Sequence, residues 1–132
     1  DAAVFLDECE LSEIQANKFS ALINENTDYK LVVETLDNMF DFMDHGDGII
    51  EAVLKGTSKA TGIAWLCNHL GIAIEDTYAI GDSINDLEML EFVGHSIAMG
   101  NASPTAKEKA EYETAHIHED GIYKALEHYH LI

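Results

Sequence analysis

A short polar segment, Gly81-Asp82-Ser83-Ile84-Asn85-Asp86, carries the residue types in this sequence that are best suited to chemistry. It follows an apolar run at residues 77–80, which predicts a strand, and ligands of parallel sheets bind where strands end. Asp82 offers a hard oxygen to a cation, and Asn85 adds an amide that can donate to an anion. Mg²⁺ suits such a site, because it takes one or two carboxylates and completes its shell with water and substrate phosphate. An Asp- and Asn-rich turn that merely caps a helix explains the same residues.

Lys59 is the second candidate, one position after Ser58, which can cap a helix. The helix dipole opposes a cation at this end by about 0.5 kcal/mol. An anionic ligand would offset that cost, since backbone N–H groups and the ammonium would then converge on one phosphate. An exposed lysine that reaches into water is the competing interpretation.

Alternating helices and short apolar strands must position these residues. After Ser58, a helix that stops at Gly71 is expected to bury one apolar face, namely Ile63, Leu66, Cys67 and Leu70. Strands are predicted at residues 77–80, 96–99 and 114–117, and the later helices are expected at Leu87 to Val93, from Ser103-Pro104, and from Asp120 with Ile122 buried. Strands that are apolar on both faces and alternate with helices predict an α/β fold with a parallel sheet.

The first part of the chain has a different pattern. A strand is predicted at residues 2–6, then a helix opened by Ser12 that carries Phe19 and Leu22, and then a strand at residues 31–34. Residues 39–44 and 49–54 flank a glycine-containing turn and predict an antiparallel pair. The density of acidic residues changes near Lys55, so we expect two domains, 1–54 and 55–132.

Composition excludes several classes of partner. The 132 residues include 25 acidic and 7 basic ones, all lysine, for a net charge of −18. Such a chain is not expected to bind nucleic acid or anionic membranes, and it has no apolar run long enough to span a bilayer. Cys9 and Cys67 form no disulfide framework, which favours the cytoplasm. The four histidines near the C-terminus are expected to be surface or packing residues.

Four segments occur in a set order along residues 55–132. They are Lys59 within GTSKATGIAWL, the run YAIGDSINDLEML at residues 78–90, IAMGNA at 97–102, and EDGI at 119–122. Together they resemble the C-terminal half of haloacid dehalogenase (HAD) superfamily phosphatases of the Cof-like type. The resemblance implies a Rossmann-type parallel core in residues 55–132, preceded by part of an inserted α+β cap in residues 1–54.

The resemblance also implies a role for each candidate. Lys59 would contact the transferring phosphoryl group, and Asp82 would ligate Mg²⁺. Asn85 would contact phosphate or substrate, while Asp86 would orient Lys59. Family members hydrolyse phosphate monoesters through an aspartyl-phosphate, so a small phosphorylated metabolite such as a sugar phosphate is the expected substrate.

One departure from the family pattern is serious. The family opens with a strand ending in D-x-D-G-T, whose first aspartate is the nucleophile, and these 132 residues lack that motif. The nearest segment ends in Asp7, with Cys9 in place of the second aspartate. The simpler interpretation makes Asp7 a turn residue and the chain a fragment that begins inside the cap and is inactive alone.

Two questions therefore stay open. A non-catalytic protein that keeps the phosphate and cation site for binding or regulation is the alternative to an enzyme, whereas a receiver-like domain fits the order of the motifs poorly. The strand at residues 77–80 would also lie at a sheet edge without the strand that bears the nucleophile. We therefore expect it to pair with a second copy of the chain or with a missing N-terminal segment.

Overall fold

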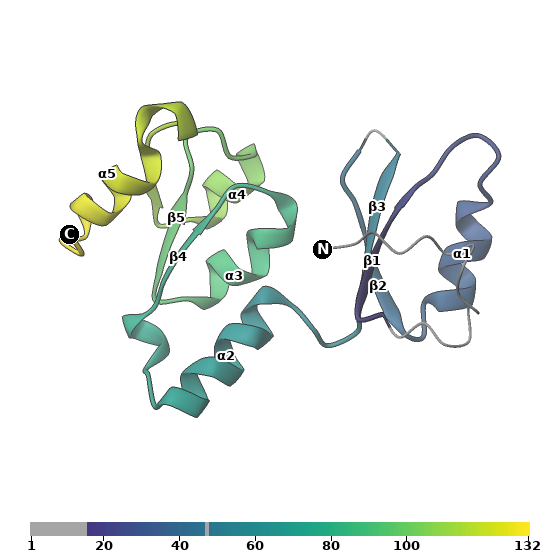
Figure 1. Ribbon diagram of the computed structural model, residues 1–132, viewed down its shortest axis with the longest axis horizontal. Coiled ribbons are helices and arrows are strands. Elements are labelled where there is room, and N and C mark those ends of the chain that lie inside the picture. Colours follow the sequence, from purple (N-terminus) through teal and green to yellow (C-terminus); the bar gives the residue numbers. More distant parts are fainter. Residues whose placement is uncertain (1–15, 47) are drawn as a thin grey trace, which may run out of the picture. The chain divides into compact units, whose positions relative to one another are not determined.

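The computed structural model describes residues 16–46 and 48–132, and the chain divides into two compact units, residues 1–55 and 56–132 (Figure 1). Each unit has its own three-stranded sheet. No helix in the described part of the chain has the length and apolar character needed to cross a membrane.

The first unit is a three-stranded antiparallel sheet with one helix. The elements are β1 (Lys18–Leu22), α1 (Tyr29–Leu36), β2 (Phe40–Asp44) and β3 (Ile49–Leu54), and the strand order is β1-β3-β2. The predicted antiparallel pair is confirmed in β2 and β3. Phe40, Ile50 and Ala52 are buried, and the ring of Phe19 meets that of Phe40 edge to face at 5.3 Å between centroids. An aromatic and aliphatic face thus holds this small sheet together.

Two predictions for this unit are wrong. Residues 18–22 form a strand and not part of a helix, because Phe19 and Ala21 alternate with more exposed neighbours and pair with β3. Residues 31–34 lie in α1 and not in a strand. The Asp28 carboxylate accepts a hydrogen bond from the Leu31 amide at 3.1 Å, and this cap outweighs the strand preference of the following valines. The predicted strand at residues 2–6 and the helix start at Ser12 lie outside the described residues.

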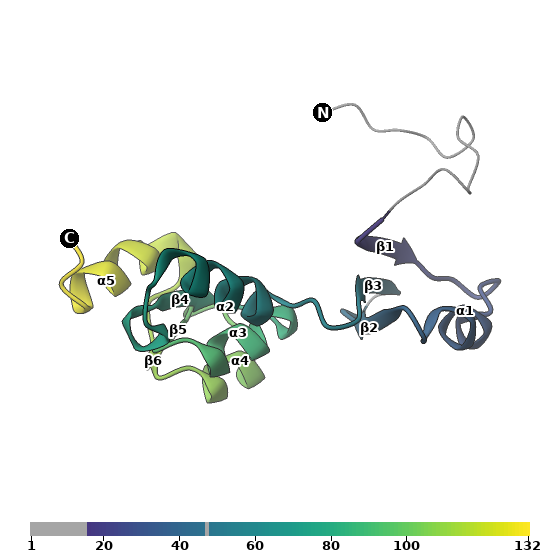
Figure 2. The ribbon, with the colours of Figure 1, turned by 90° about the horizontal axis from the view of Figure 1, so that it is seen from below.

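The second unit is a parallel sheet with helices, as predicted (Figure 2). Its strands are β4 (Tyr78–Gly81), β5 (His95–Ala98) and β6 (Tyr112–Glu113), in the order β4-β5-β6. Its helices are α2 (Lys59–Leu70), α3 (Leu87–Phe92), α4 (Pro104–Lys109) and α5 (Gly121–His128), with short 3-10 turns at η3 (Ile74–Asp76), η4 (Ile84–Asp86) and η5 (Ile117–Glu119). The carboxyl ends of β4 and β5 therefore lie side by side, which is where the sequence places its polar segment.

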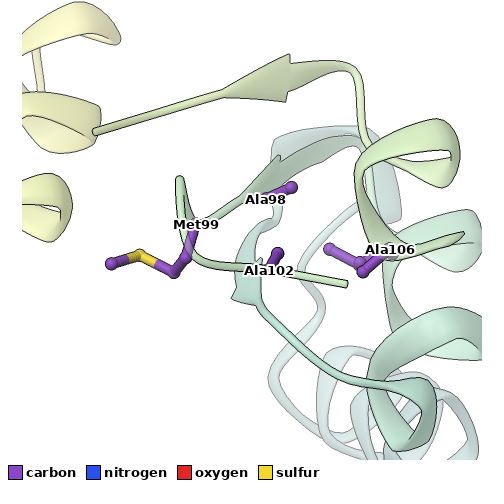
Figure 3. Packing of buried hydrophobic residues seen from close by; sticks show 5 residues of the cluster. Ala98, Met99, Ala102 and Ala106 are labelled. Atoms are coloured by element: carbon purple, nitrogen blue, oxygen red, sulfur yellow. The ribbon is translucent and has the colours of Figure 1, made fainter. Parts of the chain in front are cut away.

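Small side chains form the core where α3 and α4 meet the sheet (Figure 3). Ala98 and Ala106 are fully buried, and Leu90, Met99 and Ala102 fill the space around them. Alanine at these positions lets α4 approach β5 closely. A closely packed interior leaves few voids, so the backbones of α4 and β5 have little freedom to shift. The core thus holds rigidly the loops that follow β4 and β5.

The helix α2 begins and ends as predicted. Ser58 and Thr61 form a reciprocal cap at its start, and Gly71 ends it in the left-handed conformation with a φ of 69°. The predicted buried face is wrong in part. Of its four residues only Cys67 is buried, while Leu66 and Leu70 are 48% and 57% exposed.

The end of the chain also differs from the prediction. β6 stops at Glu113, although the Thr114 amide still donates to the Ala98 carbonyl at 2.9 Å. The hydroxyl of this buried threonine donates to the Gly121 carbonyl at 2.7 Å and ties the following loop to the start of α5. The predicted strand at residues 114–117 is therefore replaced by a loop and η5. In α5, Ala125 is buried, whereas Ile122, which was predicted to be buried, is 52% exposed.

Candidate functional site

The loop after β4 folds back on itself at Gly81. A Cβ atom at this position would lie 2.7 Å from the Cβ of Asp86 and 3.0 Å from its carboxyl carbon. No real side chain tolerates that distance, so only glycine lets the strand pass so close to this carboxylate. The loop and the 3-10 turn η4 are consequently one tight unit.

The Asp86 carboxylate organises this loop from inside. Its Oδ2 accepts hydrogen bonds from the backbone N–H groups of Asp82 at 2.9 Å and Ser83 at 3.2 Å. Its Oδ1 accepts one from the ammonium of Lys59. Burial alone raises the pKa of Asp86, but the hydrogen bonds from Lys59, Asp82 and Ser83 and the Lys59 charge outweigh it and hold the pKa below its ordinary value.

Lys59 reaches this loop from the first turn of α2. Its Nζ also lies 3.4 Å from the Oδ1 of Asn85, which accepts a second hydrogen bond, from the Ser83 hydroxyl, at 2.6 Å. The Lys59 side chain is 48% exposed, whereas that of Asp86 is 6% exposed. A buried carboxylate therefore holds the ammonium of a lysine whose side chain is half exposed.

Asp82 is held by its backbone and leaves its side chain available. Its carbonyl accepts a hydrogen bond from the Ser103 amide at 2.8 Å, at the start of α4. The residue is exposed, and among the described residues its carboxylate accepts no hydrogen bond. Its backbone is fixed by hydrogen bonds while its carboxylate is free, so Asp82 can act as a ligand of a cation.

The structure brings all four predicted residues together within one loop and one helix start. Sequence reasoning missed two contributors, the Ser83 hydroxyl and the Ser103 amide. Ser83 lies inside the motif, so its place was visible but its hydrogen bond was not. The Ser103 amide carries no sequence signal of its own beyond the Ser-Pro pair that starts a helix.

The residues of the loop after β4 can supply one protein ligand to Mg²⁺. Asp82 supplies a free, hard carboxylate oxygen, and Mg²⁺ commonly uses only one or two such protein ligands. Within residues 16–46 and 48–132, no three or more His, Cys, Asp or Glu side chains gather closely enough to hold a metal ion. The described residues therefore offer a partial site, and the histidines near the C-terminus offer none.

Comparison with known proteins decides the family. A model of haloacid dehalogenase-like hydrolases matches residues 4–126 of this chain. The chain belongs to that family. The resemblance to Cof-like phosphatases is confirmed by solved structures. A HAD subclass IIB sugar phosphatase, BT4131, has 32% identity and a TM-score of 0.73 over 87% of this chain and 44% of its own.

Other family members show the same relation. The HAD phosphatase BT1666 from Bacteroides thetaiotaomicron has 27% identity and a TM-score of 0.79 over 92% of this chain and 44% of its own. The 5-amino-6-(5-phospho-D-ribitylamino)uracil phosphatase YcsE of Bacillus subtilis is 42% identical over 61% of this chain and 32% of its own length. This chain thus spans about a third of that relative and less than half of the two solved HAD structures.

The buried carboxylate predicts a pH-dependent stability. Asp86→Asn should lower the free energy of unfolding at pH 7 by about 2 kcal/mol. An amide has one acceptor oxygen, so its NH₂ group would face either the Lys59 ammonium or the two backbone N–H groups, all of which are donors. Since folding depresses the Asp86 pKa, its contribution is present above the unfolded value of about 3.9 and is lost as the pH falls through the lower folded value. Urea denaturation should therefore show that the free energy of unfolding falls more between pH 7 and about pH 3 in the wild type than in Asp86→Asn.

Asp82→Asn is the matched control, because its carboxylate has no partner among the described residues. It should leave the unfolding free energy within about 0.5 kcal/mol of the wild type. Equal stability of Asp86→Asn and the wild type at pH 7 would contradict the organising role of Asp86.

Proposed function

We propose that this protein is a Mg²⁺-dependent phosphomonoester hydrolase that acts on a small phosphorylated metabolite, such as a sugar phosphate, in the cytoplasm. The observation that carries the proposal is the contact of Lys59 with both Asp86 and Asn85 beside the free carboxylate of Asp82. Relatives with phosphatase activity in their names, and the general use of Mg²⁺ in this superfamily, support it. We further propose residues 1–54 as part of a cap and residues 55–132 as part of the catalytic core.

Each residue would have a distinct task. Asp82 would hold Mg²⁺, which supplies positive charge to the phosphoryl oxygens when bound. Lys59 would bind a phosphoryl oxygen with the part of its ammonium that Asp86 leaves open. Asn85 would donate its amide N–H to a neighbouring oxygen. Asp86 would hold Lys59 in place, because the lowered pKa of this carboxyl keeps it ionised at neutral pH.

Ligand binding by this chain tests the assignment. Inorganic phosphate should bind in the presence of Mg²⁺, as followed by titration calorimetry or by NMR shifts of the loop amides. Asp82→Ala should remove the effect of Mg²⁺ on phosphate affinity. Lys59→Met should weaken phosphate binding about tenfold, the effect of losing one charge-assisted hydrogen bond.

Lys124→Met, on α5, is the control for the loss of one positive charge. It should bind phosphate like the wild type, and circular dichroism should show that all variants keep their helices. Undiminished phosphate binding by Lys59→Met, or an unchanged Mg²⁺ effect in Asp82→Ala, would overturn the residue assignment.

Turnover separates catalysis from binding. The 132-residue chain should not hydrolyse a chromogenic phosphate ester with Mg²⁺ at enzymatic rates, since a lysine and a metal ligand stabilise charge but do not replace a nucleophile. Asp7, the nearest counterpart of the family nucleophile, lies outside the described residues. Turnover that is lost in Asp7→Ala would instead make Asp7 the nucleophile. Phosphate binding without turnover, in a protein whose reading frame encodes no upstream D-x-D-G-T, would favour the binding or regulatory alternative.

The edge of the sheet predicts self-association. Thr77 and Gly81 direct their carbonyls to β5, so the alternation along a strand turns the N–H and C=O groups of Tyr78 and Ile80 to the open edge. Among the described residues no strand pairs with that edge. We expect a second copy of the chain to do so, with dimers at tens of micromolar by sedimentation equilibrium.

Hydrogen exchange provides the internal control. The Tyr78 and Ile80 amides should gain protection as the dimer forms, while the Ala79 amide, which faces β5, should be protected at every concentration. A stable monomer with protected Tyr78 and Ile80 amides would show that the edge is already covered within one chain.

A further inference from the structure

Ser83 lies between the exposed Asp82 and the 3-10 turn that carries Asn85. Its backbone is extended, with φ −133° and ψ 177°, and its amide is bound to the Asp86 carboxylate. Its hydroxyl donates to the Oδ1 of Asn85 at 2.6 Å. This is the shortest contact of the Asn85 side chain. The Ser83 side chain also accepts from the Asp86 amide in a capping box at the start of η4, so its hydroxyl proton is left to donate to Asn85.

Two donors meet the same oxygen of Asn85. Lys59 Nζ lies 3.4 Å from this Oδ1, and an ammonium can only donate. The amide therefore has its oxygen toward Lys59, since the opposite orientation would set N–H groups against the ammonium. With its oxygen so placed, Asn85 has its NH₂ group on the other side, and among the described residues that group has no hydrogen-bond acceptor.

We infer that Ser83 is a positioning residue, which fixes the Asn85 amide so that its NH₂ group is presented to an anionic oxygen of the ligand. The inference rests on the proposed function for the identity of that ligand, a phosphate oxygen. Lys59 alone is a weak restraint, because its contact with Asn85 is long and its stronger contact is with Asp86. The χ2 torsion of an asparagine has a broad range when no hydrogen bond restrains it. Loss of the Ser83 hydroxyl would therefore let the amide rotate.

The first arm of the test needs no ligand. Residual dipolar couplings of the Asn85 side-chain NH₂ group report whether the amide is fixed, and we expect them to fall about twofold in Ser83→Ala. Ser83→Thr keeps the hydroxyl, suits an extended backbone, and should restore the couplings. Unchanged couplings in Ser83→Ala would overturn the inference.

The second arm measures the affinity for inorganic phosphate in the presence of Mg²⁺. Ser83→Ala should bind about fivefold more weakly, the effect of one neutral hydrogen bond, and Ser83→Thr should bind like the wild type. Ser96→Ala is the matched control, because this buried serine of β5 accepts a hydrogen bond from the Glu111 amide and, within the described part of the chain, its side chain forms no hydrogen bond with the loop after β4. It should lower stability but leave the phosphate affinity unchanged.

The two arms separate the two proposals. A wild-type chain that fails to bind phosphate overturns the proposed function, and the couplings then still decide whether Ser83 fixes Asn85. A wild type that binds, with Ser83→Ala equal to it in affinity, overturns the inference alone. Weak binding by Ser83→Thr as well would show that the hydroxyl is not the group that matters.

Discussion

The Asp86 carboxylate is the interaction on which the site depends. One oxygen accepts two consecutive backbone N–H groups, and the other accepts the Lys59 ammonium. The two bonds from the backbone determine the path of the chain after β4. The bond from Lys59 determines the position of its ammonium. Backbone shape and electrostatics are thereby set by one side chain, which is why its short length and the missing Cβ at Gly81 are both required.

The packing of the second unit places the start of α4 beside the loop that Asp86 organises. Alanines at the contact of α4 with β5 let the start of α4 come near, so that the Ser103 amide reaches the Asp82 carbonyl. The Asp82 backbone is then bound on both sides, by Asp86 and by α4, while its side chain stays open. A site of this kind is rigid in its main chain and variable only in the few side-chain atoms that a ligand meets.

The sequence predicted the second unit well because its signals there are local and strong. The cap at Ser58, the stop at Gly71 and the Ser-Pro start of α4 each fix an element boundary through neighbouring atoms. The candidates Asp82, Asn85 and Asp86 could be predicted from the carboxyl-end rule for parallel sheets. The candidate Lys59 could be predicted from its place next to the cap at Ser58. In the first unit the elements are short, and the apolar residues near Phe19 fit a helical period as well as a strand, so the partner strand β3 decides. The role of Ser83 could not be predicted, because composition does not reveal which oxygen a hydroxyl approaches.

Lys59 is the first residue of α2, so the position of its charge depends on the docking of an entire helix. That helix buries Cys67 but leaves Leu66, Leu70 and Trp65 largely exposed, and therefore few apolar contacts hold it. Elements with little buried surface open locally at a lower free energy than the core. Detachment of α2 would carry Lys59 away while the sheet remained intact, and the carboxylate of Asp86 would lose its cation. We therefore expect local opening of α2 to abolish the site at a lower free energy than global unfolding requires.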